Sequence, residues 1–293
     1  MNKIAFLFAI LSIFFIGNLA AQDQVDTYKH LTVKVVGKGE PLLFIPGYSC
    51  SMDVWKEVIP IYQDRYECHV VTLPGFAENK QMLASDFLST VRDELISYIQ
   101  DKKLQKPVII GHSMGGFMGL YISASAPDLL KGVVVVDGLP YFSAMMNPTI
   151  TKEMALANAK MMQTSIEQAS DANFKLQQKG NANFLMRNKT RMEETISWSM
   201  ESDRKTLGLA IFELITTDIR EDLAKTTVPV KHLGAFSTSY TTEATVREMI
   251  TAQYQHLKTK EIVLTDQANH FIMYDDQAFL IREIDSFLEA GVE

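Results

Sequence analysis

The sequence predicts an α/β fold in which a mostly parallel sheet carries helices on both faces and a helical segment is inserted between two strands. Short β-rich runs alternate with amphipathic stretches from residue 31 onward, as in strands joined by crossover helices. The β-rich runs are continuously apolar, which is typical of strands buried on both faces. The stretch that follows residue 136 breaks the alternation, because it has helical spacing and no run typical of a strand.

The runs expected to form the sheet combine β-branched or aromatic residues with the length of a strand. In chain order they are residues 31–36, 41–45, 68–73, 108–110, 133–136, 230–233 and 262–264. Other stretches have helical spacing and are expected to cover the sheet: residues 54–62, 84–100, 114–125, 242–254 and 277–288. In the second of these helices an apolar stripe is formed by Val91, Leu95, Ile96 and Ile99, as packing against a core requires.

Residues 138–217, called the cap below, are expected to form a helical insertion, because they are rich in Met, Asn, Gln and Ala and far exceed an ordinary connecting loop. The ranges 22–137 and 218–293 then form the core of the domain. The cap contains a set of methionines, whose flexible thioether chains suit either an adaptable apolar pocket or the cap's own interior. They are Met145, Met146, Met154, Met161, Met162, Met186, Met192 and Met200.

The N-terminus has the pattern of a secretory signal peptide over residues 1–21. Lys3 supplies a positive charge, residues 4–16 form a largely apolar run, and Ala20 and Ala21 follow as small residues. An apolar run of 13 residues is too short to cross a bilayer, whose core takes about 20. We therefore expect cleavage near Ala21 and an exported protein, periplasmic or secreted, without a membrane anchor.

Charge and residue spacing narrow the classes of partner. The formal net charge is −7 and no run of five Lys or Arg occurs, so the basic surface that nucleic-acid binding requires is missing. The His and Cys residues never fall into the spacings of a metal site. We therefore expect a small-molecule substrate and no metal or cofactor, with the oligomeric state left open. Cys50 and Cys68 are either two buried thiols or, after export, a disulfide.

The strongest local signal is Gly111-His112-Ser113-Met114-Gly115, which lies between a predicted strand and a predicted helix. A serine on so sharp a turn needs strained backbone angles, and the flanking glycines remove side chains that would clash. The following helix directs its N–H groups and positive dipole end to the place where an oxyanion would form. The pattern predicts that Ser113 is a nucleophile.

A serine nucleophile needs a positioned base. His270 follows the last predicted strand and precedes the final helix, so it lies on a late loop. His112 adjoins the serine, but we expect its side chain to point away across the turn. The remaining histidines are expected to be surface or core residues: His30, His69, His232 and His256.

Together these motifs resemble the α/β-hydrolase fold superfamily over nearly the whole chain after residue 21. The matching segments are Phe44-Ile45-Pro46-Gly47-Tyr48, Leu73-Pro74-Gly75-Phe76, the turn at Ser113, the cap, and Asn269-His270-Phe271. The resemblance implies a sheet of the eight-stranded type and an oxyanion hole built from the backbone N–H groups of Tyr48 and Met114. Pro46 stands where the family usually has a histidine, which affects the loop and not the backbone donors.

The resemblance leaves the acid of the catalytic triad open. The family most often places an Asp after the strand that follows the cap, where this chain has Ser237. Certain haloalkane dehalogenases, which also resemble this chain, carry the acid at the end of the strand before the cap. Asp137 stands at that position and is expected to orient His270, unless it merely caps the strand. Glu243 is the alternative.

The resemblance implies a serine hydrolase that forms an acyl-enzyme, because epoxide hydrolases and haloalkane dehalogenases of this superfamily use an Asp nucleophile. We expect a carboxylic ester of a small or medium apolar substrate. Lactone or carbon–carbon bond hydrolysis, an aminopeptidase of the proline-iminopeptidase type, and a non-catalytic ligand-binding protein remain alternatives. The aminopeptidase would need acidic cap residues to hold a substrate amine, and the candidates are Glu153, Glu193, Glu194 and Glu201.

Overall fold

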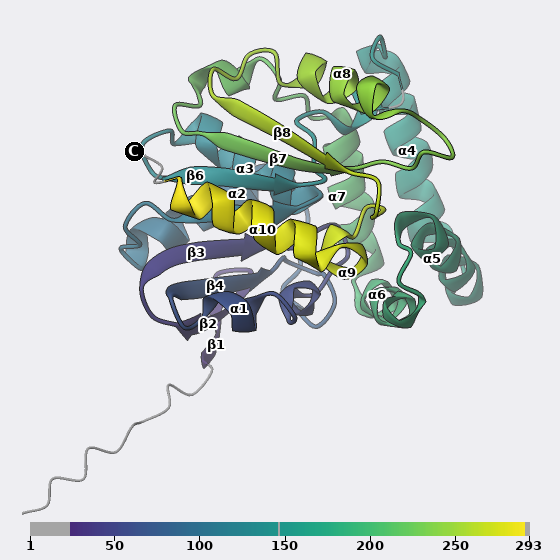
Figure 1. Cartoon of the computed structure of the whole chain (residues 1–293). Helices are drawn as coiled ribbons and strands as arrows, with labels where there is room; N and C mark the ends of the chain where they lie inside the picture. The colour runs from purple at the N-terminus through teal and green to yellow at the C-terminus, as the bar shows by residue number, and fades with distance from the viewer. Residues whose placement is uncertain (1–23, 146, 291–293) are drawn as a thin grey trace, which may run out of the picture.

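The computed structural model describes residues 24–145 and 147–290, and the predicted signal peptide, residues 1–21, lies outside them. The described residues form an eight-stranded sheet in the order β1-β2-β4-β3-β5-β6-β7-β8 (Figure 1). Strands β1, β2 and β4 pair antiparallel, and the remaining neighbours pair parallel. The strands are β1 Gln24–Tyr28, β2 Leu31–Gly37, β3 Glu40–Ile45, β4 Tyr66–Thr72, β5 Val108–His112, β6 Gly132–Val136, β7 Val230–Ala235 and β8 Lys260–Thr265.

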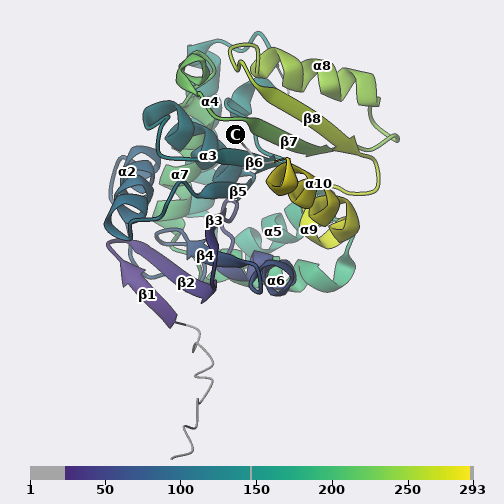
Figure 2. The same cartoon turned by 60° about the vertical axis from the view of Figure 1, so that its left-hand side comes forward.

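Neighbouring residues of the central strands enter cores on opposite faces of the sheet, because side chains alternate along a strand. Leu43 packs in one core with helices α2 Phe87–Asp101, α3 Met114–Ser125 and α8 Glu243–Gln253. Phe44 packs in the other core with α1 Ile59–Tyr62, α9 Ile272–Asp275 and α10 Gln277–Glu289. Figure 2 shows α2 and α10 on opposite sides of β5 and β6. The prediction of a mostly parallel sheet covered on both faces is confirmed.

All strands expected from the sequence are present, with bounds that differ by a few residues, and β1 was not expected. Residues 24–28 are mostly polar and pair only with β2, at the edge of the sheet. An edge strand needs no continuous apolar run, because it is not buried between two neighbours. Its position therefore follows from pairing with β2 and not from a pattern of its own.

The helix expected over residues 54–62 is wrong in its extent. The segment forms a 3₁₀ helix, Met52–Trp55, followed by the single turn of α1. Pro60 lies at the start of α1, and because proline has no N–H to donate it begins a helix more readily than it continues one. The helix expected over 114–125 coincides with α3.

The described part of the segment between β6 and β7 contains four α-helices: α4 Lys152–Gln168, α5 Asp171–Leu185, α6 Lys189–Glu201 and α7 Arg204–Thr216. Each begins at a side chain that accepts a hydrogen bond from an N–H of the first turn, and these capping residues are Thr151, Ser170, Asn188 and Asp203. Figure 1 shows the four helices together on one side of the sheet. None of the helices in the described ranges is both long and apolar enough to cross a membrane.

The methionines of this segment divide between interior and surface. Met186 and Met192 are buried in the core shared with α10, whereas Met154 and Met161 on α4 are exposed. Met146 lies outside the described residues.

Cys50 and Cys68 are free thiols, and both are buried. Burial raises the pKa of each thiol to about 12, which disfavours the reactive thiolate.

Candidate active site

Ser113 lies between the last residue of β5 and the first residue of α3. Its backbone has φ 53° and ψ −117°, a combination that residues with a side chain rarely adopt. The Ser113 N–H donates to the Val136 carbonyl, 2.8 Å away at the end of β6. The strained turn that the sequence predicts is therefore present, and it is tied to the neighbouring strand.

The two glycines of the motif allow close contacts around this turn. A Cβ atom at Gly111 would lie 2.2 Å from the Gly115 carbonyl oxygen, and one at Gly115 would lie 2.2 Å from the Ile45 carbonyl oxygen. Both distances are far shorter than a carbon–oxygen contact allows, and the obstructing atoms belong to the backbone. The spacing Gly-x-Ser-x-Gly thus follows from packing of α3 against β3 and β5.

Asp137 and His270 are in direct contact, although 133 positions separate them in the sequence. His270 Nδ1 lies 2.7 Å from Asp137 Oδ2, and Asp137 Oδ1 accepts from the Ala235 N–H at 3.0 Å. A carboxylate only accepts, so His270 Nδ1 carries the proton and Nε2 is left as an acceptor. About a quarter of each side chain is exposed. This arrangement holds the imidazole in one orientation, as a general base requires.

The other two positions considered for the acid do not make this contact. Glu243 begins α8, and its Oε1 accepts from Arg247 Nη2 at 2.7 Å on an exposed face. Ser237 follows β7, and its carbonyl oxygen accepts from the N–H groups of Tyr240 and Thr241. Among the carboxylates that the sequence offered, Asp137 is the one that the structure brings to His270.

The loop after β3 lies against the nucleophile, as the oxyanion hole would require. A Cβ atom at Gly47 would lie 3.1 Å from Ser113 Cβ, which places Tyr48 beside this contact along the chain. The Tyr48 hydroxyl donates to the Leu207 carbonyl of α7 at 3.0 Å. Met114 is the first residue of α3, and the N–H groups of a first helical turn have no acceptor within the helix. Their dipoles favour negative charge at this end of α3.

His112 is the residue whose position the sequence did not predict. We expected its side chain to point away, but it lies buried against His270 with the two rings 4.7 Å apart. Its Nε2–H donates to the His270 carbonyl at 3.1 Å. Burial, followed by the neighbouring His270 charge, holds the pKa of His112 well below its usual range. His112 is therefore a neutral support beneath His270, which its place next to Ser113 alone could not show.

The acidic cap residues considered for an aminopeptidase are either paired or on the surface. Glu194 is paired with Lys56 and Arg191, and Glu201 accepts from the Ser197 hydroxyl. Glu153 and Glu193 are exposed. The described residues include no group of three or more His, Cys, Asp or Glu side chains that could hold a metal ion.

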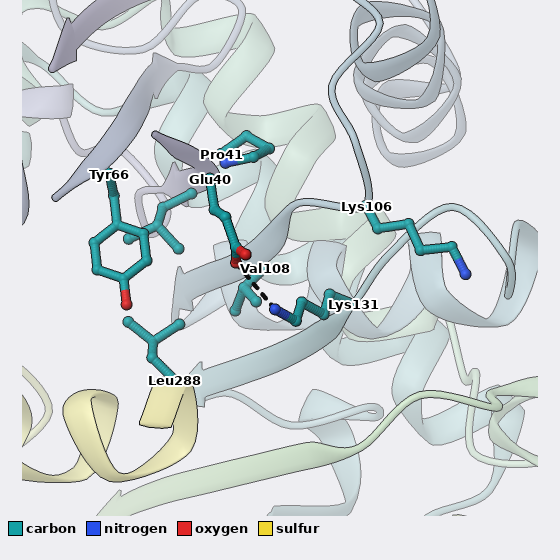
Figure 3. A pocket seen from close by; sticks show the side chains of 8 residues that line it. Glu40, Pro41, Tyr66, Lys106, Val108, Lys131 and Leu288 are labelled. Carbon is teal, nitrogen blue, oxygen red and sulfur yellow. Dashed lines mark hydrogen bonds and ion pairs between the residues drawn. The ribbon is translucent and has the colours of Figure 1, made fainter. Parts of the chain in front are cut away.

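A small pocket lies elsewhere in the molecule (Figure 3). Its lining includes Glu40 and Val108, which are the first residues of β3 and β5, and the Lys131 ammonium lies 2.9 Å from Glu40. Ser113 and Asp137 follow the last residues of their strands. Since these strands are parallel, the pocket lies at the opposite ends of the strands from Ser113 and Asp137.

Comparison with known proteins matches this architecture. A family model described as alpha/beta hydrolase fold matches residues 40–198. The chain is 23% identical to a pimeloyl-[acyl-carrier protein] methyl ester esterase of Aliivibrio salmonicida over 86% of this chain and 94% of that protein. It is 30% identical to the protein of the same name from Wigglesworthia glossinidia brevipalpis over 41% of this chain and 46% of that protein.

Solved structures resemble the whole described fold. A thermophilic esterase from Thermogutta terrifontis superposes with a TM-score of 0.76 at 17% identity, covering 93% of this chain and 100% of that chain. A hydrolase from Pseudomonas aeruginosa PA01 gives a TM-score of 0.74 at 17% identity, covering 93% and 99%. At these identities the superpositions establish a shared fold.

Proposed function

The chain belongs to the alpha/beta hydrolase fold family and is a hydrolase, and we propose that it cleaves carboxylic esters of small or medium apolar substrates. In this proposal Ser113 is the nucleophile, His270 the general base and Asp137 the residue that orients the base. The observation that carries it is the 2.7 Å contact between His270 Nδ1 and Asp137 Oδ2, made beside a strained serine turn.

The reaction proceeds through an acyl-enzyme. His270 Nε2 takes the proton of the Ser113 hydroxyl while Oγ attacks the ester carbonyl carbon. The backbone N–H groups of Tyr48 and Met114 donate to the resulting oxyanion. The tetrahedral intermediate collapses, the alcohol leaves with the proton from His270, and water, activated by the same imidazole, releases the carboxylic acid.

The choice of an ester rests on the relatives and on the surroundings of the site. Curated relatives that align over most of their length carry the name methyl ester esterase. The segment 138–217, which we propose acts as a cap over the site, contributes apolar side chains to the core next to His270, including Met186 and Met192. Sites for apolar acyl groups are mostly lined by such side chains.

Export is a second part of the proposal, and it rests on the pattern of residues 1–21. Expression of the full chain with fractionation and N-terminal sequencing tests it. We expect a processed protein outside the cytoplasm that begins near residue 22. A full-length protein retained in the cytoplasm would contradict export without affecting the proposed chemistry.

The proposed activity is tested with p-nitrophenyl esters of increasing acyl length. We expect turnover by the wild type, and loss to the background rate in Ser113→Ala and His270→Ala. Ser237→Ala is the matched control, because it removes a half-buried serine hydroxyl after β7 and should keep wild-type rates.

Labelling with a fluorophosphonate separates the remaining outcomes. Labelling that requires Ser113, without turnover of any ester, would reject the ester and retain the serine mechanism. A wild type that is neither labelled nor active would contradict both.

A further inference from the structure

The loop that carries His270 is held by the cap through several hydrogen bonds. Arg187, in the connection between α5 and α6, donates from Nε to Asn269 Oδ1 at 3.0 Å and from Nη2 to the Asp266 carbonyl at 2.8 Å. In return, Asn269 Nδ2 donates to the Phe184 carbonyl at 2.9 Å. The guanidinium thus joins two points of the loop, both on the N-terminal side of His270.

Asp275 ties the same two segments together from the other end of the loop. Its carboxylate accepts from the backbone N–H groups of Arg187 at 3.0 Å and Asn188 at 2.8 Å, both of which belong to the cap connection. It also accepts from the Asn269 N–H at 3.0 Å. A single carboxylate therefore bonds the cap and the residue next to His270.

These bonds restrain the backbone on both sides of His270. Asn269 is held as described, and the Phe271 N–H donates to the Leu185 carbonyl at 3.3 Å. Asp137 holds the His270 ring, and His112 bonds the carbonyl oxygen and lies against the ring. The bonds from the cap add restraints on the neighbouring backbone, and a general base must be held within a fraction of an ångström of its working position.

We infer that the Arg187 guanidinium and the Asp275 carboxylate form a clasp that positions His270 for catalysis. The inference rests on the proposed serine mechanism. Arg187 touches no reacting atom and is a positioning residue: it acts through Asn269 and Asp266. The clasp makes the orientation of the base depend on the placement of the end of α5 and its connection to α6, residues 184–188.

Replacement of the guanidinium alone tests the clasp. Arg187→Ala keeps its backbone N–H bonds to Asp275, so the fold should persist. We expect kcat to fall about tenfold with little change in KM, because the base is misplaced while the substrate site remains. Guanidinium ion added to the solution should restore part of the lost kcat. Lys189→Ala is the matched control, since Lys189 is a nearby exposed cap cation bonded to Asn183.

A double-mutant cycle shows whether Arg187 acts through Asn269. The kcat of Asn269→Ala and that of the double variant should be close to the kcat of Arg187→Ala, since the two side chains form one unit. Fully additive losses, or a change in KM with an unchanged kcat, would overturn the inference. So would a kcat of Arg187→Ala equal to that of the wild type.

Amide hydrogen exchange distinguishes failure of the clasp from failure of the proposed function, since it needs no substrate. Exchange in residues 266–275 should be faster in Arg187→Ala than in the wild type and in Lys189→Ala. Wild-type protein without esterase activity but with this difference would reject the ester and leave the clasp supported as a loop restraint. Equal exchange in all three proteins would overturn the clasp.

Discussion

Asp137 uses its two carboxylate oxygens for different contacts. Oδ2 meets His270 Nδ1, and Oδ1 accepts from the Ala235 N–H at the end of β7. The backbone N–H of Asp137 also donates to the Leu233 carbonyl at 2.7 Å. Since β6 and β7 are neighbours in register at their ends, an acid that follows β6 lies next to the position of one that follows β7. This adjacency explains how an acid that follows either β6 or β7 can reach a histidine in the same position.

Replacement of the acid, Asp137→Asn, should lower kcat/KM by about 10⁴-fold while the protein stays folded. The Asn oxygen can still accept from the Ala235 N–H, but the amide then presents a donor to His270 Nδ1. The imidazole must carry its proton on Nε2, where it can no longer accept the serine proton. Ester turnover measures the fall in kcat/KM, and circular dichroism measures whether the protein stays folded. Glu243→Gln is the control, and a wild-type rate in Asp137→Asn would move the search for the acid elsewhere.

The turn between β5 and α3 is the element on which the site depends. It brings α3 so near to β3 that the Ile45 carbonyl occupies the space of a Gly115 side chain. The Ser113 N–H is bonded across to β6, so the strained angles are held from two sides. Strain of this kind persists where the surrounding structure holds it, and here the neighbouring strands β5 and β6 are fully buried.

Addition of a methyl group in this turn, Gly115→Ala, should destabilise the fold by several kcal/mol, as overpacking against backbone atoms does. Gly180→Ala is the matched control, because Gly180 lies inside α5 and a Cβ there meets nothing within 4 Å. We expect Gly180→Ala to gain about 0.5–1 kcal/mol from helix propensity. Urea unfolding measures both, and similar midpoints for the two variants would contradict the close approach of α3 to β3.

Two buried histidines with lowered pKa values, His112 and His232, lie near the residues of the site. His232 lies in the middle of β7, the strand whose backbone is hydrogen-bonded to Asp137. Its Nδ1 lies 3.1 Å from the Tyr254 hydroxyl. Burial lowers the pKa of His232 to about 4, although Asp137 opposes the change. The folded protein therefore excludes a proton that the unfolded chain would accept near its ordinary pKa of about 6.5.

The pH dependence of stability follows with a definite sign. Between about pH 6.5 and pH 4 the unfolded chain binds the His232 proton and the folded protein does not, so the free energy of unfolding falls as the pH falls. For a pKa lowered to about 4 the full effect is about 3 kcal/mol. Urea unfolding of the wild type and His232→Gln at pH 7 and pH 4.5 measures it. The variant should lose less stability on acidification, and equal losses would contradict the buried neutral state.

The order of strands and helices, the helical character of residues 138–217 and the serine turn could be predicted from the sequence. Apolar periodicity distinguishes strand from helix along a short stretch, and the motif around Ser113 can be recognised within five residues, although its Gly115 is required by the contact with Ile45 of β3. Strand β1 was not predicted, because it depends on pairing with β2 at the edge of the sheet. The break before α1 was not predicted either, and Pro60 accounts for it.

Contacts between residues far apart in the chain could not be predicted from the sequence. The sequence left Asp137, Glu243 and a structural role for Asp137 as alternatives, and the contact with His270 depends on β6 and β7 lying side by side. The place of His112 beneath His270 and the bonds of Arg187 to the histidine loop likewise join segments far apart in the chain. Such contacts leave no periodic or local trace, because they are set by the packing of whole elements against one another.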